Sequence, residues 1–170
     1  MAKKIVSAIV ALFGSLAKNN LMKNVIVFII SMCPILELRG GLIAASLLKM
    51  DPIISYIICI IGNIVPIPFI LWFMAKILNW MRGSKHVKKF ALWLDKKVEK
   101  NKGKIEKYGY LGLVLFVGIP LPGTGAWTGC MVASVLELDK KKSFIAAILG
   151  VLLASIIMMI IAFGLLPKVI

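Results

Sequence analysis

Two uncharged apolar runs, residues 52–75 and 143–166, constrain the fold of this chain more than any other feature. At about 1.5 Å per residue each forms a helix about 36 Å long, enough to cross a hydrocarbon layer of about 30 Å. Hydrophobic residues make up 61% of the 170 positions, against about 45–50% in soluble domains. The sequence therefore predicts a protein of the cytoplasmic membrane with several passes, and argues against a water-soluble enzyme or a nucleic-acid-binding module.

The formal net charge of +14 must lie mostly outside the hydrocarbon, because a charged side chain there costs several kcal/mol. Residues 82–107 carry ten Lys and Arg against three acids, which is half of that net charge. Apolar residues recur there at helical spacing, with lysines on the other face. This pattern predicts a basic amphipathic helix on an anionic lipid surface, and nucleic-acid binding is the less favoured alternative. His86 lies in this stretch without an assigned role.

The N-terminal residues 1–20 are expected to form an amphipathic helix in the membrane interface. The apolar stretch 5–16 is shorter than the about 20 residues needed to span. No small-x-small cleavage site follows it, so no cleaved signal peptide is expected. Cys33, Cys59 and Cys130 lie in apolar segments without a C-x-x-C pair or a nearby histidine. We expect buried thiols at these positions, with no disulfide, metal site or cofactor.

Two further apolar segments are interrupted near their middle. Residues 24–48 are interrupted over 33–41, which contain Pro34 and the sequence Glu-Leu-Arg-Gly-Gly, and residues 109–138 are interrupted over the Pro-Leu-Pro-Gly-Thr-Gly of 120–125. Each arm has about 10–13 residues, roughly half a bilayer thickness. Prolines and glycines at that depth predict non-helical backbone, which lipid tolerates only where protein or a water-filled cavity surrounds it.

The two halves of the chain align without a gap at an offset of 88 residues. Proline, glycine and aspartate matches carry this alignment: Pro34 with Pro122, Gly41 with Gly129, Asp51 with Asp139 and Gly62 with Gly150. We interpret the chain as one membrane domain, 1–170, with repeats at 24–80 and 109–167, each a broken segment followed by a spanning helix. Asp51 and Asp139 precede those helices and are expected to cap them.

The broken segments allow two topologies. As re-entrant hairpins that dip to the midplane, they would let each repeat cross the membrane once, so that the repeats are inverted. As broken spanning helices, they would give parallel repeats and would gather the basic segments on one face, as the positive-inside rule favours. The half-bilayer arms and polar tips favour the hairpins. The expected fold is therefore an all-α membrane protein with an inverted repeat of re-entrant hairpins.

Glu37 and Arg39 are the only ionisable residues well inside an apolar segment, and an intramembrane charge indicates function by default. Arg39 is one of two arginines in the chain, and its planar guanidinium suits a carboxylate or phosphate. Glu37 is expected to carry a coupling proton. The alternative is a buried ion pair that only locks the tip, but such a pair is a poor source of stability.

At the second tip, Gly125 aligns with Glu37 and Trp127 aligns with Arg39. The run Gly123-Thr124-Gly125-Ala-Trp127-Thr128-Gly offers successive backbone N–H groups before a helix, an arrangement suited to an anion. A plain tight turn is the alternative. With Arg39 and Gly40 of the first tip, the substrate-binding prediction comprises Gly123, Thr124, Gly125, Trp127 and Thr128.

The first spanning helix contains two interior prolines, Pro66 and Pro68, which free the carbonyls of Gly62 and Ile64. The neighbouring Asn63 can satisfy one of these groups or line a polar path, and a purely structural kink is equally open. The predicted hinge or path-lining set is Asn63, Pro66, Pro68, Pro34, Pro120 and Pro122.

Taken together, the motifs Glu37-Leu-Arg-Gly-Gly, Gly62-Asn-x-x-Pro-x-Pro, Lys107-Tyr-Gly and Pro120-Leu-Pro-Gly-Thr-Gly-Ala-Trp-Thr-Gly resemble the small multidrug export protein family, which is related to the DedA superfamily. The resemblance covers roughly residues 20–165. It implies two oppositely facing re-entrant hairpins that meet at the midplane, and a link to lipid-linked phosphate carriers such as undecaprenyl phosphate. DedA proteins have differently spaced acids and arginines, and this chain has no second membrane arginine.

The resulting hypothesis is a transporter whose midplane site moves an anionic or phosphate-bearing lipid, coupled to H⁺ or, as an open alternative, Na⁺. Export of small drugs is the first alternative, with Trp127 as an aromatic wall for a cation. A non-transporting membrane scaffold is the second. No nucleophile–base pair or metal constellation is visible, so an enzyme is not predicted. The expected partners are membrane lipids and the substrate, and a homodimer is an open alternative.

Overall fold

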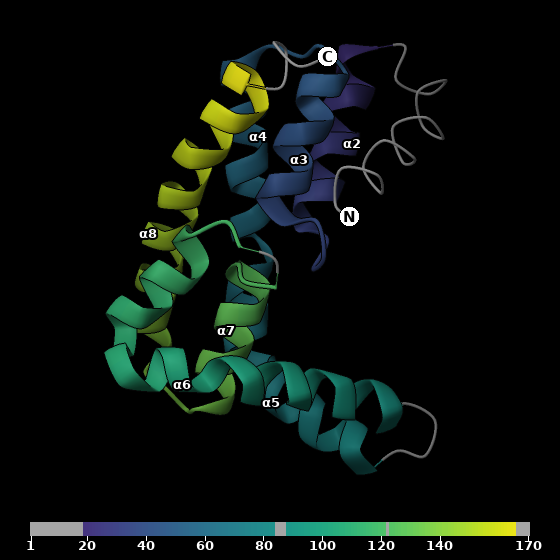
Figure 1. Cartoon of the computed structure of the whole chain (residues 1–170). Coiled ribbons are helices and arrows are strands. Elements are labelled where there is room, and N and C mark those ends of the chain that lie inside the picture. Colours follow the sequence, from purple (N-terminus) through teal and green to yellow (C-terminus); the bar gives the residue numbers. More distant parts are fainter. Residues whose placement is uncertain (1–18, 84–87, 122, 166–170) are drawn as a thin grey trace. The chain divides into compact units, whose positions relative to one another are not determined.

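The computed structural model describes residues 19–83, 88–121 and 123–165, and helices with short connections account for all of them. In chain order these are α2 (Asn20–Met32), α3 (Glu37–Leu47), α4 (Pro52–Ile64), α5 (Pro66–Gly83), α6 (Lys88–Gly118), α7 (Ala126–Val135), α8 (Lys140–Met159) and the π-helix η1 (Ile160–Leu165) (Figure 1). The predicted all-α class is confirmed. The expected N-terminal helix falls almost wholly outside the described residues, as do His86 and Pro122.

Among the described residues, two helical stretches are long and apolar enough to cross a membrane, Pro52–Leu78 and Lys140–Gly164, with 27 and 25 residues. They coincide with the two uncharged runs of the sequence. The first stretch combines α4 and α5, which meet at Val65, directly before Pro66. Pro66 has no backbone N–H to offer the carbonyl four residues earlier, which accounts for the break at this point.

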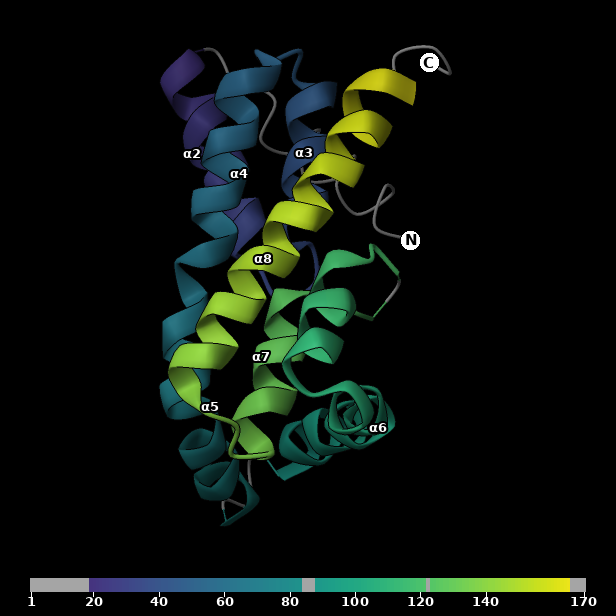
Figure 2. The same ribbon diagram turned by 90° about the vertical axis from the view of Figure 1, so that its left-hand side faces the viewer.

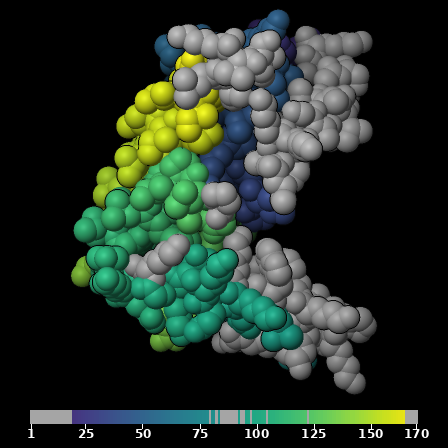
Figure 3. Space-filling view, in the orientation of Figure 1, coloured from purple at the N-terminus to yellow at the C-terminus, as the bar shows by residue number. Residues whose placement is uncertain are grey.

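Both stretches keep large apolar side chains on their outer surfaces. Exposed residues recur at helical spacing along them: Ile53, Ile57, Ile61, Phe69, Phe73 and Ile77 in the first stretch, and Ile145, Leu149, Leu152, Ile156 and Ile160 in the second. The outer surface of α8 is visible in yellow in Figure 3. The buried face of the second stretch includes small residues, among them Ala147 and Ala154, whereas that of the first includes Ile67 and Leu71. This distribution is expected of helices that contact lipid outside and pack on helices inside.

The described chain divides into two compact units, residues 19–65 with 151–165, and residues 66–150. In the first unit, α2, α3 and α4 lie side by side (Figure 2). The connection 33–36 reverses the chain between α2 and α3, and at the open end of this hairpin Lys23 Nζ donates to the carbonyl of Leu48 at 3.2 Å. Close approach depends on small residues, because a Cβ at Gly62 would lie 2.8 Å from the carbonyl oxygen of Phe28.

The second unit contains a similar hairpin, made by the end of α6 and by α7 (Figure 1). Gly109 has φ 57 and ψ −134, a conformation that requires glycine, and it divides α6 into a basic part from Lys88 and an apolar part that ends at Gly118. At the open end, the amide of Asp139 donates to the hydroxyl of Tyr110 at 3.2 Å. A Cβ at Gly150 would lie 2.6 Å from Val117 Cβ, so α8 also packs closely here.

The basic part of α6 has the two faces that the sequence predicts, within the side chains described. Val98 and Ile105 are buried. On the outer face, Lys102 Nζ lies 2.8 Å from Glu99 Oε1. The hydrogen bond from Lys102 to Glu99 raises the pKa of Lys102 above its ordinary value.

The local structure recurs at the 88-residue interval. Lys49 and Glu137 both have left-handed backbone, with φ 52 and 54. The amides of Met50 and Leu138 each donate to the carbonyl five residues earlier, at 3.0 Å. The predicted aspartate caps are also confirmed: Asp51 Oδ1 accepts from the amides of Ile53 and Ile54 at 2.9 Å, and Asp139 Oδ1 accepts from Lys142 at 2.8 Å.

One detail of the first interruption is wrong in the sequence-based prediction. Residues 37–41 were expected to be non-helical, but they begin α3, and only 33–36 are outside a helix. Gly41 lies inside α3 at a position with no room for a side chain, because a Cβ there would lie 2.8 Å from the sulfur of Cys59. Cys59 and Cys130 are buried free thiols, as expected, and Cys33 is half-buried.

Candidate functional site

The first tip is formed by the connection 33–36, which contains Pro34, and by the first turn of α3. Glu37 begins the helix with only 6% of its surface exposed and with φ 51. A non-glycine residue in such a conformation costs on the order of 1–3 kcal/mol. At the equivalent position of the other repeat a glycine, Gly125, has φ 136. The chain therefore has a buried glutamate with strained backbone at the position where the other repeat has a glycine.

Arg39 is half-buried on the same turn of α3, and its guanidinium interacts electrostatically with Glu37. Gly40 follows where no side chain fits, because a Cβ there would lie 2.5 Å from the Cβ of Leu36. The structure thus brings Glu37, Arg39 and Gly40 together in one turn. Chemically, the turn offers a guanidinium for an anionic group and a carboxylate that can exchange a proton.

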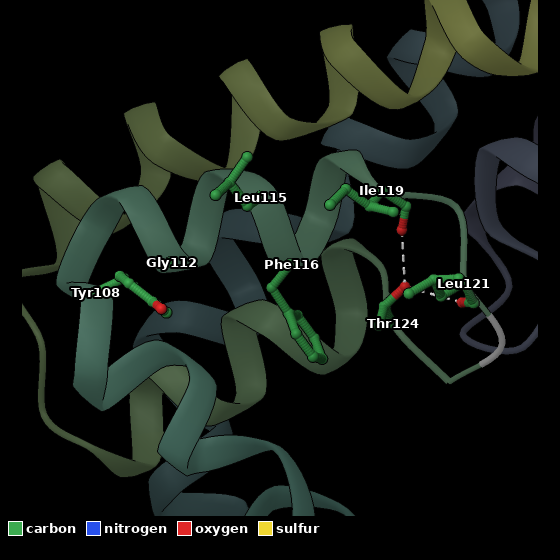
Figure 4. Close-up of a pocket in the computed structure, with 7 residues that line it drawn as sticks. All are labelled: Tyr108, Gly112, Leu115, Phe116, Ile119, Leu121 and Thr124. Carbon is green, nitrogen blue, oxygen red and sulfur yellow. Dashed lines mark hydrogen bonds between the residues drawn. The ribbon is translucent and has the colours of Figure 1, made fainter.

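The second tip is a loop between α6 and α7 whose hydrogen bonds converge on Thr124 (Figure 4). The hydroxyl of Thr124 donates to the carbonyls of Ile119 at 3.0 Å and Leu121 at 2.8 Å, and its amide donates to Leu121 at 3.2 Å. The Thr124 side chain therefore shapes the loop. Gly123 is exposed with φ 85, and Pro120 is half-buried.

The start of α7 holds the remaining residues of the predicted second tip. Gly125 is the N-cap residue, Trp127 is half-buried and Thr128 is buried. The N-terminus of α7 directs backbone N–H groups toward this end, which favours negative charge. The anion hypothesis for this tip thus depends on backbone groups more than on the threonine hydroxyls.

Asn63 lies in the last turn of α4, just before the break at Val65, and is 3% exposed. Within the described part of the chain, its Oδ1 has no hydrogen-bond partner. A buried acceptor without a partner costs roughly 1–3 kcal/mol. Pro66, which begins α5, is buried, and Pro68 is half-buried. Asn63 is thus a polar group available to a ligand, an ion or water at the break.

Ser46 and Ser134 are two positions that the sequence matched but to which it assigned no role. In the first unit, Ser46 Oγ donates to the carbonyl of Ala162 in η1 at 2.7 Å. In the second unit, Ser134 Oγ lies between an amide and a carbonyl one turn apart on α5, at 3.3 Å from Ala75 N and 3.4 Å from Leu71 O. The signal that could have identified them is their exact 88-residue spacing on two otherwise apolar hairpins.

Comparisons with known proteins give one match. A family model described as "Putative small multi-drug export protein" matches residues 37–157, more than two thirds of the chain. The matched range begins at Glu37 and includes both tips except for 33–36. No match was found among curated proteins or among solved structures.

Proposed function

Since the chain belongs to the small multi-drug export protein family, we propose that it is a proton-coupled membrane transporter that uses Glu37 as its proton-carrying group. Family membership and the two long apolar helices identify it as a membrane protein. The observation that carries the transport mechanism is Glu37 itself, which is buried, strained and adjacent to Arg39, whereas the equivalent residue is a glycine.

We propose that both hairpins are re-entrant. In each unit, the hairpin's two open ends are connected by a hydrogen bond, Lys23 to Leu48 in one and Asp139 to Tyr110 in the other. The arms are short: α3 has 11 residues and α7 has 10, which is about 15–17 Å of helix and half of a bilayer core. Each repeat would then cross the membrane once, so the second would be inverted relative to the first.

Two substrate classes follow from different observations. Arg39 and the N-terminus of α7 favour an anionic or phosphate-bearing lipid, because both offer positive electrostatic potential to a phosphate. The family description and the half-buried Trp127 favour export of small drugs, since an aromatic wall suits an organic cation. A phosphate-bearing lipid substrate would fit a relation to the DedA superfamily, and that relation stays a prediction.

Reconstituted proteoliposomes test the coupling. With a pH gradient imposed, wild-type protein should move one of the two substrate classes faster than it does without the gradient. Glu37→Gln should remove the dependence on the gradient, and Glu37→Asp should retain part of it, because only the latter keeps a titratable carboxyl. Lys100→Gln, a charge change on the exposed face of α6, is the control.

Arg39 separates the substrate classes in the same assay. Arg39→Gln should stop phosphate-lipid movement but leave export of a cationic drug, whereas a scaffold would show neither activity in any variant. Gradient-dependent transport that persists in Glu37→Gln would show that the proposed proton site is wrong.

A further inference from the structure

An apolar groove on α6 belongs to neither tip hypothesis. Its lining comes from α6 and from the adjoining loop: Tyr108, Gly112, Leu115, Phe116, Ile119, Leu121 and Thr124 (Figure 4). Tyr108 lies just before the break at Gly109, and the positions from Gly112 to Ile119 belong to the apolar part of α6. From Gly112 to Ile119 the apolar part runs about 10 Å, most of the depth of one leaflet's hydrocarbon.

The groove is too small for a typical drug-sized molecule. Its lining is also too apolar for a molecule that carries polar groups along its whole length. Its volume is about 190 Å³, below the about 300–1,000 Å³ of typical small-molecule sites. Tyr108 and Thr124 carry the only side-chain hydroxyls of the lining, and the Thr124 hydroxyl donates to the carbonyls of Ile119 and Leu121. The inner end is therefore apolar, and a polar occupant would lose hydrogen bonds to water there without replacement.

The outer end of the groove is cationic and aromatic. Tyr108 is 56% exposed and lies beside Gly109, where the basic part of α6 gives way to its apolar part. The ammonium of Lys107 lies 5.2 Å from the centre of the Tyr108 ring, and that of Lys142 lies 6.0 Å from the centre of the Tyr110 ring. Tyrosine with lysine is typical of the level of lipid headgroups, where lysine attracts anionic lipids.

We infer that this groove binds one acyl chain of an anionic phospholipid, with the headgroup held near Lys107, whose ammonium lies over the lining residue Tyr108. A cationic mouth followed by an apolar groove of about 190 Å³ matches the charge and polarity of such a lipid. The bound chain contacts Leu121 and Thr124 at its inner end and so stabilises the second tip. This site does not depend on the transport mechanism, because it requires only that the protein lies in a membrane.

Native mass spectrometry of the detergent-purified full chain tests the site with phosphatidylglycerol and with phosphatidylcholine of the same acyl chains. One phosphatidylglycerol should bind per chain, in preference to phosphatidylcholine. Lys107→Gln should reduce phosphatidylglycerol binding by about fivefold, the effect of removing one lysine at an anionic lipid surface. Lys100→Gln, on the same helix but away from the groove, should leave it unchanged.

Filling the groove tests the acyl-chain position. Leu115 lines the groove and is 42% exposed, whereas Leu111 is 63% exposed on the same helix and does not line it. Leu115→Trp should weaken the binding of both lipids by about tenfold. This is the change in affinity expected when about two methylene groups are displaced from an apolar site. Leu111→Trp should bind like the wild type.

Three outcomes would overturn the site: equal binding of the two lipids, loss of binding in Leu111→Trp as in Leu115→Trp, or a dimer whose formation competes with the lipid. Circular dichroism on each variant separates loss of the site from loss of the fold. Lipid binding is measured without a pH gradient or a transported substrate. A negative result for the lipid site is therefore distinguishable from a negative result for the proposed transport.

Discussion

Gly125 and Glu37 occupy equivalent positions of the two hairpins, and both have positive φ at the start of a helix. Gly125 has φ 136 and ψ −177, a region open essentially only to glycine, and Glu37 adopts a left-handed conformation that side chains tolerate at a cost. Positive φ at the start of the second helix is therefore adopted by a glycine in one repeat and by a glutamate in the other.

Replacing Gly125 should be strongly destabilising. Gly125→Ala places a side chain in a glycine-only conformation and should lower the free energy of unfolding by about 1–3 kcal/mol. Gly103 in α6 is exposed, and a Cβ there would meet nothing within 4 Å. Gly103→Ala should therefore raise stability, by up to about 1 kcal/mol. Thermal unfolding of both variants in detergent measures the difference, and equal effects would contradict the assigned backbone conformation.

Asn63 should show opposite effects on stability and activity. In Asn63→Leu, a leucine side chain of similar shape replaces the asparagine. The change removes the buried Oδ1, which has no partner in the described part of the chain. Stability should be unchanged or raised by about 1 kcal/mol. Transport should fall if the amide serves a substrate or an ion at the break. Lower stability together with normal transport would show that Asn63 is a structural residue with a partner.

At the scale of elements, each hairpin is connected to a long helix by one serine hydroxyl, Ser46 in the first unit and Ser134 in the second. Ser134 lies between Leu71 O and Ala75 N, which are the carbonyl and amide that an unperturbed helix would pair with each other. A side chain inserted in this way bends a helix locally. Ser46 binds the carbonyl of Ala162 inside a π-helix, another irregular turn. The serine of each hairpin thus contacts the backbone of a long helix, and in the first unit that contact falls in the π-helix η1.

Serine substitutions test these contacts. Ser46→Ala and Ser134→Ala should each lower the free energy of unfolding by about 0.5–1.5 kcal/mol, the value of an intramolecular hydrogen bond. Ser143 is the matched control, because its Oγ is buried without a hydrogen-bond partner among the described residues. Ser143→Ala should be neutral or stabilising. If all three variants lose the same stability, packing volume and not the hydrogen bonds would account for the effect.

The sequence predicts helix boundaries well where neighbouring residues alone determine them. Asp51 and Asp139 predict their helix starts because a carboxylate accepts amide hydrogen bonds wherever it precedes a helix. The sequence predicts a helix break at Gly41, but this residue is a packing position inside α3, where Cys59, eighteen positions later, leaves no room for a side chain. The groove on α6 was missed for a similar reason, since Leu121 and Thr124 close it only after the chain turns at the second tip.

The candidate site is predicted only in part. Glu37 and Arg39 are identifiable because charge inside an apolar segment is rare. The backbone strain at Glu37 is not identifiable, because φ depends on how α3 is held against α2 and α4. Thr124 belongs to the predicted substrate-binding set, but its hydroxyl donates to loop carbonyls that the sequence alone does not locate.

At the scale of the whole molecule, the hairpin topology makes a labelling prediction. In a background without Cys33, Cys59 and Cys130, single cysteines at Met22 and Lys49 should react with a membrane-impermeant maleimide from the same side. The reason is that the ends of α2 and α3 meet at the Lys23 to Leu48 hydrogen bond. Reaction from opposite sides would require α2 and α3 to span as one broken helix, and would contradict the re-entrant proposal.

The division into compact units has a consequence for biosynthesis. The first unit combines residues 19–65 with 151–165, so it draws on parts of the chain that leave the ribosome far apart in time. The hydroxyl of Ser46 has no access to the carbonyl of Ala162 until more than a hundred further residues have been made and inserted. The first hairpin therefore lacks its contact with η1 while the second is synthesised, so the first unit is completed only after the second has been made.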